Sequence, residues 1–113
     1  MKNCAFFLFF CLAGCSSADK PVRPKSVIDK EKMIELMGAV FLLENYYQHT
    51  FGMPSIYKAP LKISVDSVFN KYGVSAKEYA LNYRYYAQQY TVFHEMNVVI
   101  IERYNQKLLE LAK

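Results

Sequence analysis

The chain has 113 residues and a formal net charge of +4, with 53% hydrophobic and 21% charged residues. This length suits one small domain, and the mixed composition excludes a wholly disordered chain. The modest charge, with no concentrated run of basic residues, argues against a nucleic-acid-binding protein.

The first fifteen residues, MKNCAFFLFFCLAGC, have the pattern of a bacterial lipoprotein signal peptide. Lys2 gives a positive n-region, and the apolar run 5–12 is too short to span a bilayer. The run ends in an aliphatic residue, two small residues and a cysteine, which is the lipobox pattern: Leu12, Ala13, Gly14 and Cys15. We therefore expect removal of residues 1–14 and a covalent S-diacylglyceryl and N-acyl lipid on Cys15.

The residues after the lipobox indicate where the protein is held. Ser16 stands where an aspartate favours retention in the inner membrane, so we expect an outer-membrane anchor with the domain facing the periplasm. Residues 15–25 are polar, contain Pro21 and Pro24, and are expected to form a short lipidated tether. Only one cysteine remains after cleavage, so no disulfide is expected.

Apolar residues spaced three and four apart predict an all-α domain over residues 26–113, a small bundle of three to four helices. The first helix is expected to begin near Asp29, which can cap it, with Ile28 and Met33 as a hydrophobic staple. It continues through KEKMIELMGAVFLLENYY.

Glu44 is the most unusual residue of this helix, because it falls in the middle of the apolar face. A carboxylate in an apolar setting costs several kcal/mol unless it is paired. Either the face is open there, or Glu44 meets a donor such as Arg84, Arg103 or a tyrosine hydroxyl. A buried strut between helices is the favoured interpretation, and an acid of a binding site is the alternative.

Residues 48–62, QHTFGMPSIYKAPLK, contain Gly52, Pro54 and Pro60 and are predicted to form a long loop. The segment is apolar for a loop, and long loops are usually packed or functional.

Three further helices are expected after this segment. A short helix fits residues 65–72 and stops at Gly73. Ser75 and Glu78 form a capping box that fixes the start of the next helix at Ala76. A last helix is expected over about residues 91–111.

Tyrosines gather in the stretch EYALNYRYYAQQY. Four of them, at spacings of four, three and four, share one helical face and are predicted to be core: Tyr79, Tyr83, Tyr86 and Tyr90. Another tyrosine lies off this face. Together with two aromatic residues of the expected loop and a valine of the last helix, it makes up the candidate contact surface: Phe51, Tyr57, Tyr85 and Val98.

Several stretches within about residues 27–108 carry a resemblance: IDKEKMIEL, VFNKYGVSAKEY, NYRYY and VIIERYN. Behind a lipobox, this combination resembles a domain-of-unknown-function family of small lipoproteins common in Bacteroidota. The resemblance implies a small, helical, membrane-anchored protein without an assigned activity. The chain departs from the family pattern at Ala39 and Phe41, where relatives tend to carry an Asp and a His, and at Tyr90, where they often have a proline.

No catalytic or cofactor motif is present. His94 and Glu95 are adjacent on a helix and point about 100° apart, so they cannot chelate one ion together. We therefore expect a non-catalytic binding or assembly module for another envelope protein, without metal, nucleic acid or any cofactor beyond the lipid. The alternative is a ligand-binding or chaperone-like periplasmic protein with a groove built from the 48–62 loop and the tyrosine face. A homo-oligomer is compatible with either function.

Overall fold

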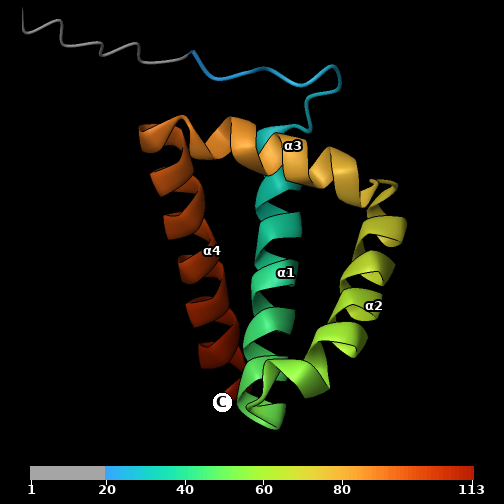
Figure 1. Ribbon diagram of the computed structural model, residues 1–113. Helices are drawn as coiled ribbons and strands as arrows, with labels where there is room; N and C mark the ends of the chain where they lie inside the picture. Colours follow the sequence, from blue (N-terminus) through green and yellow to red (C-terminus); the bar gives the residue numbers. More distant parts are fainter. Residues whose placement is uncertain (1–19) are drawn as a thin grey trace, which may run out of the picture.

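The computed structural model describes residues 20–113, and these residues form four α-helices and no strand (Figure 1). The helices are α1 (Lys30–Phe51), α2 (Pro54–Tyr72), α3 (Ala76–Ala87) and α4 (Tyr90–Leu111). The predicted all-α fold is confirmed. The lipobox lies outside the described residues: Leu12, Ala13, Gly14 and Cys15.

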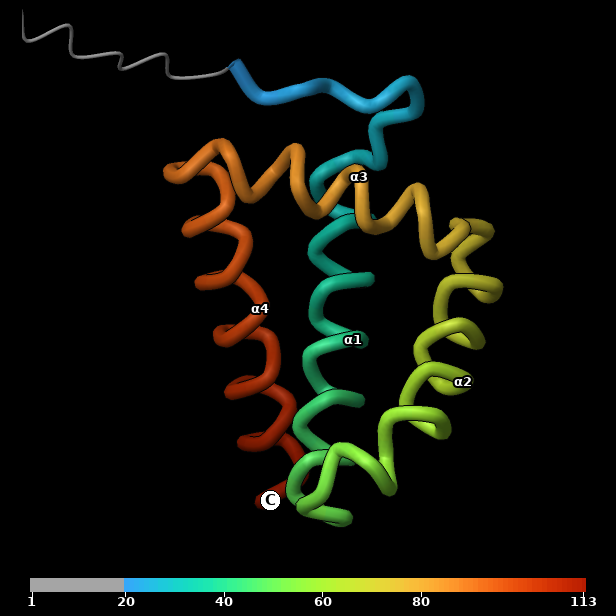
Figure 2. Tube along the Cα trace, viewed as in Figure 1, coloured from blue at the N-terminus to red at the C-terminus, as the bar shows by residue number. Residues whose placement is uncertain are grey.

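The helices form an open layer that is closed at one end. α1 lies in the middle with α2 and α4 on either side, and α3 crosses the end of the layer where α1 and α4 begin and α2 ends (Figures 1 and 2). The C-terminus lies at the opposite end of the layer from α3. Within residues 20–113, no helix combines the length and apolar character that crossing a bilayer requires.

Local capping determines where two of the helices begin. The Asp29 side chain accepts a hydrogen bond of 3.0 Å from the Lys32 N–H at the start of α1. At the start of α3, the Glu78 N–H donates to Ser75 Oγ at 3.1 Å, and the Ser75 N–H donates to Glu78 Oε2 at 2.8 Å. Both predicted caps are confirmed, because each uses only contacts within one turn of the chain.

The expected loop over residues 48–62 is wrong, since these residues are helical except for Gly52 and Met53. Gly52 ends α1 with a φ of 68°, and Pro54 occupies the first position of α2, where a missing N–H costs nothing. Pro60 is tolerated inside α2, because it and Ile56, whose carbonyl loses its helical donor, are both exposed to water.

The hydrophobic core is concentrated near α3. Met33, Leu36 and Met96 are fully buried there, and Phe69, Tyr86 and Ile100 pack around them. Towards the other end of the layer, apolar side chains of α1 and α4 are exposed: Phe41, Leu42, Ile101, Leu108, Leu109 and Leu111. A single layer of helices cannot cover both faces of its central helix, so the far half of α1 keeps apolar surface in water.

Candidate functional site

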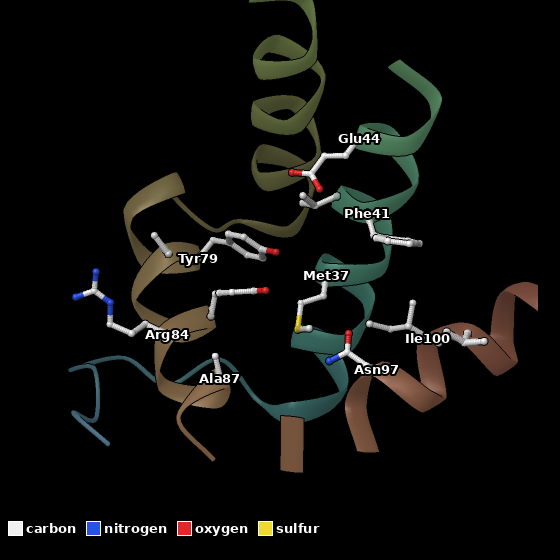
Figure 3. A pocket seen from close by; sticks show the side chains of 12 residues that line it. Met37, Phe41, Glu44, Tyr79, Arg84, Ala87, Asn97 and Ile100 are labelled. Atoms are coloured by element: carbon white, nitrogen blue, oxygen red, sulfur yellow. The ribbon is translucent and has the colours of Figure 1, made fainter. Parts of the chain in front are cut away.

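A groove of about 680 Å³ opens where α1, α3 and α4 meet (Figure 3). We call it the three-helix groove. It is lined chiefly by Met37, Val40, Phe41 and Glu44 of α1, Tyr79, Tyr83 and Arg84 of α3, and Asn97, Ile100 and Ile101 of α4.

The groove runs from the core out to solvent along α1. Met37 is buried beneath α3, whereas Phe41, one turn further along α1, is 54% exposed. On α4, Ile100 is buried and Ile101 is exposed. The same apolar stripes that build the core therefore continue past the reach of α3 and form an uncovered apolar surface.

Glu44 is exposed, so the expectation of a buried strut is wrong, and the open-face alternative describes it. Within residues 20–113 it forms no ion pair, and Arg103, one of its expected partners, is paired with Glu31 at 2.6 Å. Figure 3 shows the Glu44 carboxylate directed towards the Tyr79 side of the groove, while the Arg84 guanidinium points away. Helical periodicity placed Glu44 correctly on the apolar face, but that face has no helix over it.

Two tyrosine rings of α3 line the groove and pack against aromatic rings of α2 and α4. Tyr79 of α3 packs on Phe69 of α2 with 4.7 Å between ring centroids, and Tyr83 meets Phe93 of α4 edge to face at 5.5 Å. Burial raises the pKa of the Tyr79 phenol well above its usual value of 10, and the nearby Tyr83 and Glu44 raise it further. The groove therefore contains a neutral phenol, that of Tyr79, near the Glu44 carboxylate.

The four-tyrosine stripe is only partly core. Tyr86 is buried and Tyr79 half-buried, but Tyr83 is 42% exposed at the groove and Tyr90 is 83% exposed. The prediction fails at Tyr90 because α3 ends at Ala87, so the regular helical spacing does not continue to that residue.

The four residues of the candidate contact surface do not come together. Tyr85 is half-buried against the core and meets Tyr86 edge to face at 5.3 Å. Phe51 lies at the far end of α1, where it stacks on Tyr47. Tyr57 is half-buried on α2, and Val98 is exposed on α4. We therefore place the candidate interaction surface at the three-helix groove instead.

Asn82 is a structural residue that sequence reasoning missed. It is fully buried, its Oδ1 accepts from the Ile28 N–H at 2.8 Å, and its Nδ2 donates to the Ser26 and Glu78 carbonyls at 3.0 and 2.9 Å. Its position three residues after Tyr79 and four before Tyr86 places an amide on the buried face, which was the available signal.

A second, shallower groove of about 340 Å³ lies between α1 and α4 beside Gly38, Leu42 and Tyr104. The Tyr104 hydroxyl donates to the Gly38 carbonyl at 2.5 Å, and a Cβ on Gly38 would lie 3.2 Å from that hydroxyl oxygen. Gly38 thus allows α4 to approach α1 closely. Among residues 20–113, no three His, Cys, Asp or Glu side chains come close enough to hold a metal ion.

A family model described as a domain of unknown function (DUF4296) matches residues 24–110. The matched range includes nearly all of the four helices and all of the residues named in the three-helix groove. No curated protein and no solved structure matches the chain.

Proposed function

The chain belongs to the DUF4296 family, a domain of unknown function, and we propose that it is a non-catalytic, membrane-anchored binding module of the cell envelope. Its three-helix groove receives an apolar segment of another envelope protein. One observation carries this proposal: an exposed carboxylate, Glu44, lies in an apolar and aromatic groove without a cationic partner among residues 20–113.

Membrane anchoring is the part of this proposal that rests on sequence alone. The lipobox supports a diacylglyceryl lipid on Cys15, and Ser16 supports an outer-membrane position facing the periplasm. Together with the stretches IDKEKMIEL, VFNKYGVSAKEY, NYRYY and VIIERYN, the lipobox supports membership of the small lipoproteins common in Bacteroidota. Cys15→Ser should abolish labelling by radioactive fatty acid and leave the signal peptide attached, and normal processing of this variant would disprove the anchor.

The chemistry of the groove defines the segment that it takes. Phe41 and Ile101 present exposed apolar surface, which gains free energy when a partner covers it. Glu44 at the same surface favours a lysine or arginine on the partner, because a charge-assisted hydrogen bond is shorter and stronger than a neutral one. The expected occupant is therefore an apolar segment, such as one face of an amphipathic helix, with a basic residue beside it.

Crosslinking in intact cells, followed by mass spectrometry, tests this function. One envelope protein should be captured in stoichiometric amount, and its yield should fall in the Phe41→Ala and Glu44→Gln variants. Leu42→Ala is the matched control, because Leu42 is 55% exposed on the same helix but lines the second groove. Equal capture by all three variants, each with an unchanged melting temperature, would exclude the three-helix groove as the binding site.

The size and aromatic wall of the groove also favour a second candidate function, the binding of a small periplasmic ligand such as a glycan. A volume of about 680 Å³ is within the usual range of ligand pockets, and Tyr79 and Tyr83 supply ring faces and hydroxyls. The 48–62 segment, expected to form part of this groove, does not line it. Calorimetric titration with envelope glycan fragments would distinguish this function, and many heterogeneous crosslinked proteins would instead indicate a chaperone-like role.

A further inference from the structure

The outer surface of α3 is basic and faces away from the rest of the helices. Lys77, Leu81 and Arg84, at spacings of four and three, share one exposed face of α3. The opposite face carries Asn82 and Tyr86 into the core. Arg84 also lines the three-helix groove, but its guanidinium points away from it.

The chain leading to α1 adds three more cations to this end of the molecule: Lys20, Arg23 and Lys25. This chain is held on α3. The Gln88 side chain accepts from the Val22 N–H at 3.2 Å, and the Tyr86 hydroxyl donates to the Ile28 carbonyl at 2.6 Å. Burial raises the pKa of the Tyr86 phenol, as do Tyr85 and Asp29, and Arg23 is close enough to lower it partly. The described part of the expected tether, residues 20–25, thus makes a hydrogen bond to Gln88 at Val22.

These five cations are not neutralised within the described part of the chain. The ion pairs among residues 20–113 involve Lys30, Lys62 and Arg103, and none involves the five. Glu78, the acid nearest along α3, is already engaged with Ser75 in the capping box. Two apolar side chains of the same segments are also exposed: Val22, 75% exposed, and Leu81, 45% exposed.

We propose that this surface, formed by Lys20, Val22, Arg23, Lys25 and the Lys77–Leu81–Arg84 face of α3, docks on anionic lipid headgroups. We call it the α3 surface. Cations interspersed with exposed apolar side chains are the composition of protein surfaces that lie in a membrane interface. The inference goes beyond the groove function and shares with it only the lipid anchor on Cys15.

Chain length favours a membrane over a soluble acidic partner. Lys20 lies five positions after Cys15, so at about 3.5 Å per residue the chain between them spans no more than about 18 Å. A lipid on Cys15 therefore keeps the α3 surface within reach of the headgroups. Docking would orient the layer with α3 on the membrane and the C-terminus away from it, leaving the three-helix groove open to the side for a partner.

A fluorescent reporter can test this docking, because the chain has no tryptophan. The full lipidated chain carrying Leu81→Trp is reconstituted in vesicles of anionic or of neutral lipid that contain brominated acyl chains. Quenching of the tryptophan is expected in anionic vesicles and should be lost at high salt or in neutral vesicles. Val22→Trp provides a second reporter on the same surface, and Ile63→Trp on α2, 71% exposed, should not be quenched.

Charge reversal separates specific docking from a general effect of net charge. Lys77→Glu with Arg84→Glu should abolish the quenching of the Leu81→Trp reporter. The matched control, Lys58→Glu with Lys107→Glu, changes the net charge equally at exposed sites on α2 and α4 and should leave quenching intact. Equal quenching in neutral vesicles, or no effect of the α3 reversal, would overturn the proposal.

Separate measurements distinguish a failure of membrane docking from a failure of the lipid anchor or of partner binding at the three-helix groove. The mass of the purified chain reports the lipid on Cys15 directly. Capture of an envelope partner depends on Phe41 and Glu44, which lie outside the α3 surface. A lipidated chain that captures its partner but shows no quenching would refute docking alone.

Discussion

The Tyr86 hydroxyl donates a hydrogen bond of 2.6 Å to the carbonyl of Ile28, a residue 58 positions earlier in the chain. Asn82, one turn before Tyr86, accepts from the N–H of the same Ile28 at 2.8 Å. Two side chains of α3 thus satisfy both backbone polar groups of one residue that lies outside the helices. This pairing closes the end of the helical layer and fixes where the N-terminal chain leaves the domain.

Asn82→Ala should be among the most destabilising single substitutions in the domain. It would leave the buried Ile28 N–H without an acceptor and the Ser26 carbonyl without its donor. We expect a loss of about 1–3 kcal/mol in the free energy of unfolding, measured by urea denaturation. Asn105→Ala, at an exposed site on α4, should change it by less than about 0.5 kcal/mol. Similar losses in both variants would show that the Ile28 contact contributes little.

Gly38 and Tyr104 should be energetically coupled. In the wild type, Tyr104→Phe removes the hydrogen bond to the Gly38 carbonyl and should cost about 1 kcal/mol. In a Gly38→Ala background, the new Cβ would lie 3.2 Å from the Tyr104 hydroxyl oxygen, which must then shift by a few tenths of an ångström, so the same substitution should cost less. A double-mutant cycle by chemical denaturation measures this coupling, and strictly additive effects would contradict it.

The capping box of α3 should contribute to stability in a pH-dependent way. Hydrogen bonds from the Ser75 backbone and side chain lower the pKa of Glu78 below its usual value of 4.5. A lowered pKa in the folded state gives stability that is present above pH 4.5 and lost as the pH falls through the folded pKa. Denaturation at several pH values should therefore show a steeper acid loss in the wild type than in Glu78→Gln. If stability falls equally with pH in the wild type and in Glu78→Gln, Glu78 does not contribute to the acid loss.

Features of this structure that depend on a few neighbouring residues can be predicted from the sequence more readily than features that depend on distant ones. The caps at Asp29 and Ser75 were predictable, because each is specified within four residues. Pro54 and Pro60 misled the prediction, because a proline that begins a helix and an exposed proline inside one look the same in sequence as loop residues.

The candidate site was harder to predict for a different reason. Periodicity shows that Glu44 shares a face with apolar residues, but whether a helix covers that face depends on how α2, α3 and α4 are arranged around α1. The same holds for the basic surface: Lys20 and Arg23 are far from Arg84 in sequence, and contacts of α3 with residues 22–28 bring them to one end of the fold.

The stability of the domain at alkaline pH should depend on Tyr79, which lines the three-helix groove. Burial, with added effects of Tyr83 and Glu44, raises the pKa of its phenol above 10 in the folded state. A raised folded pKa gives stability that is fully present below pH 10 and decreases as the pH rises beyond it, because the unfolded chain releases the proton more readily. Tyr79→Phe should make this decrease in stability less steep. Phenolate absorbance follows the titration of the tyrosines, and circular dichroism follows unfolding. Tyr90→Phe is the control. Tyr90 is exposed, so this substitution should leave the loss of stability above pH 10 unchanged. If both substitutions reduce the loss of stability above pH 10 equally, burial of the Tyr79 phenol is not the cause of that loss.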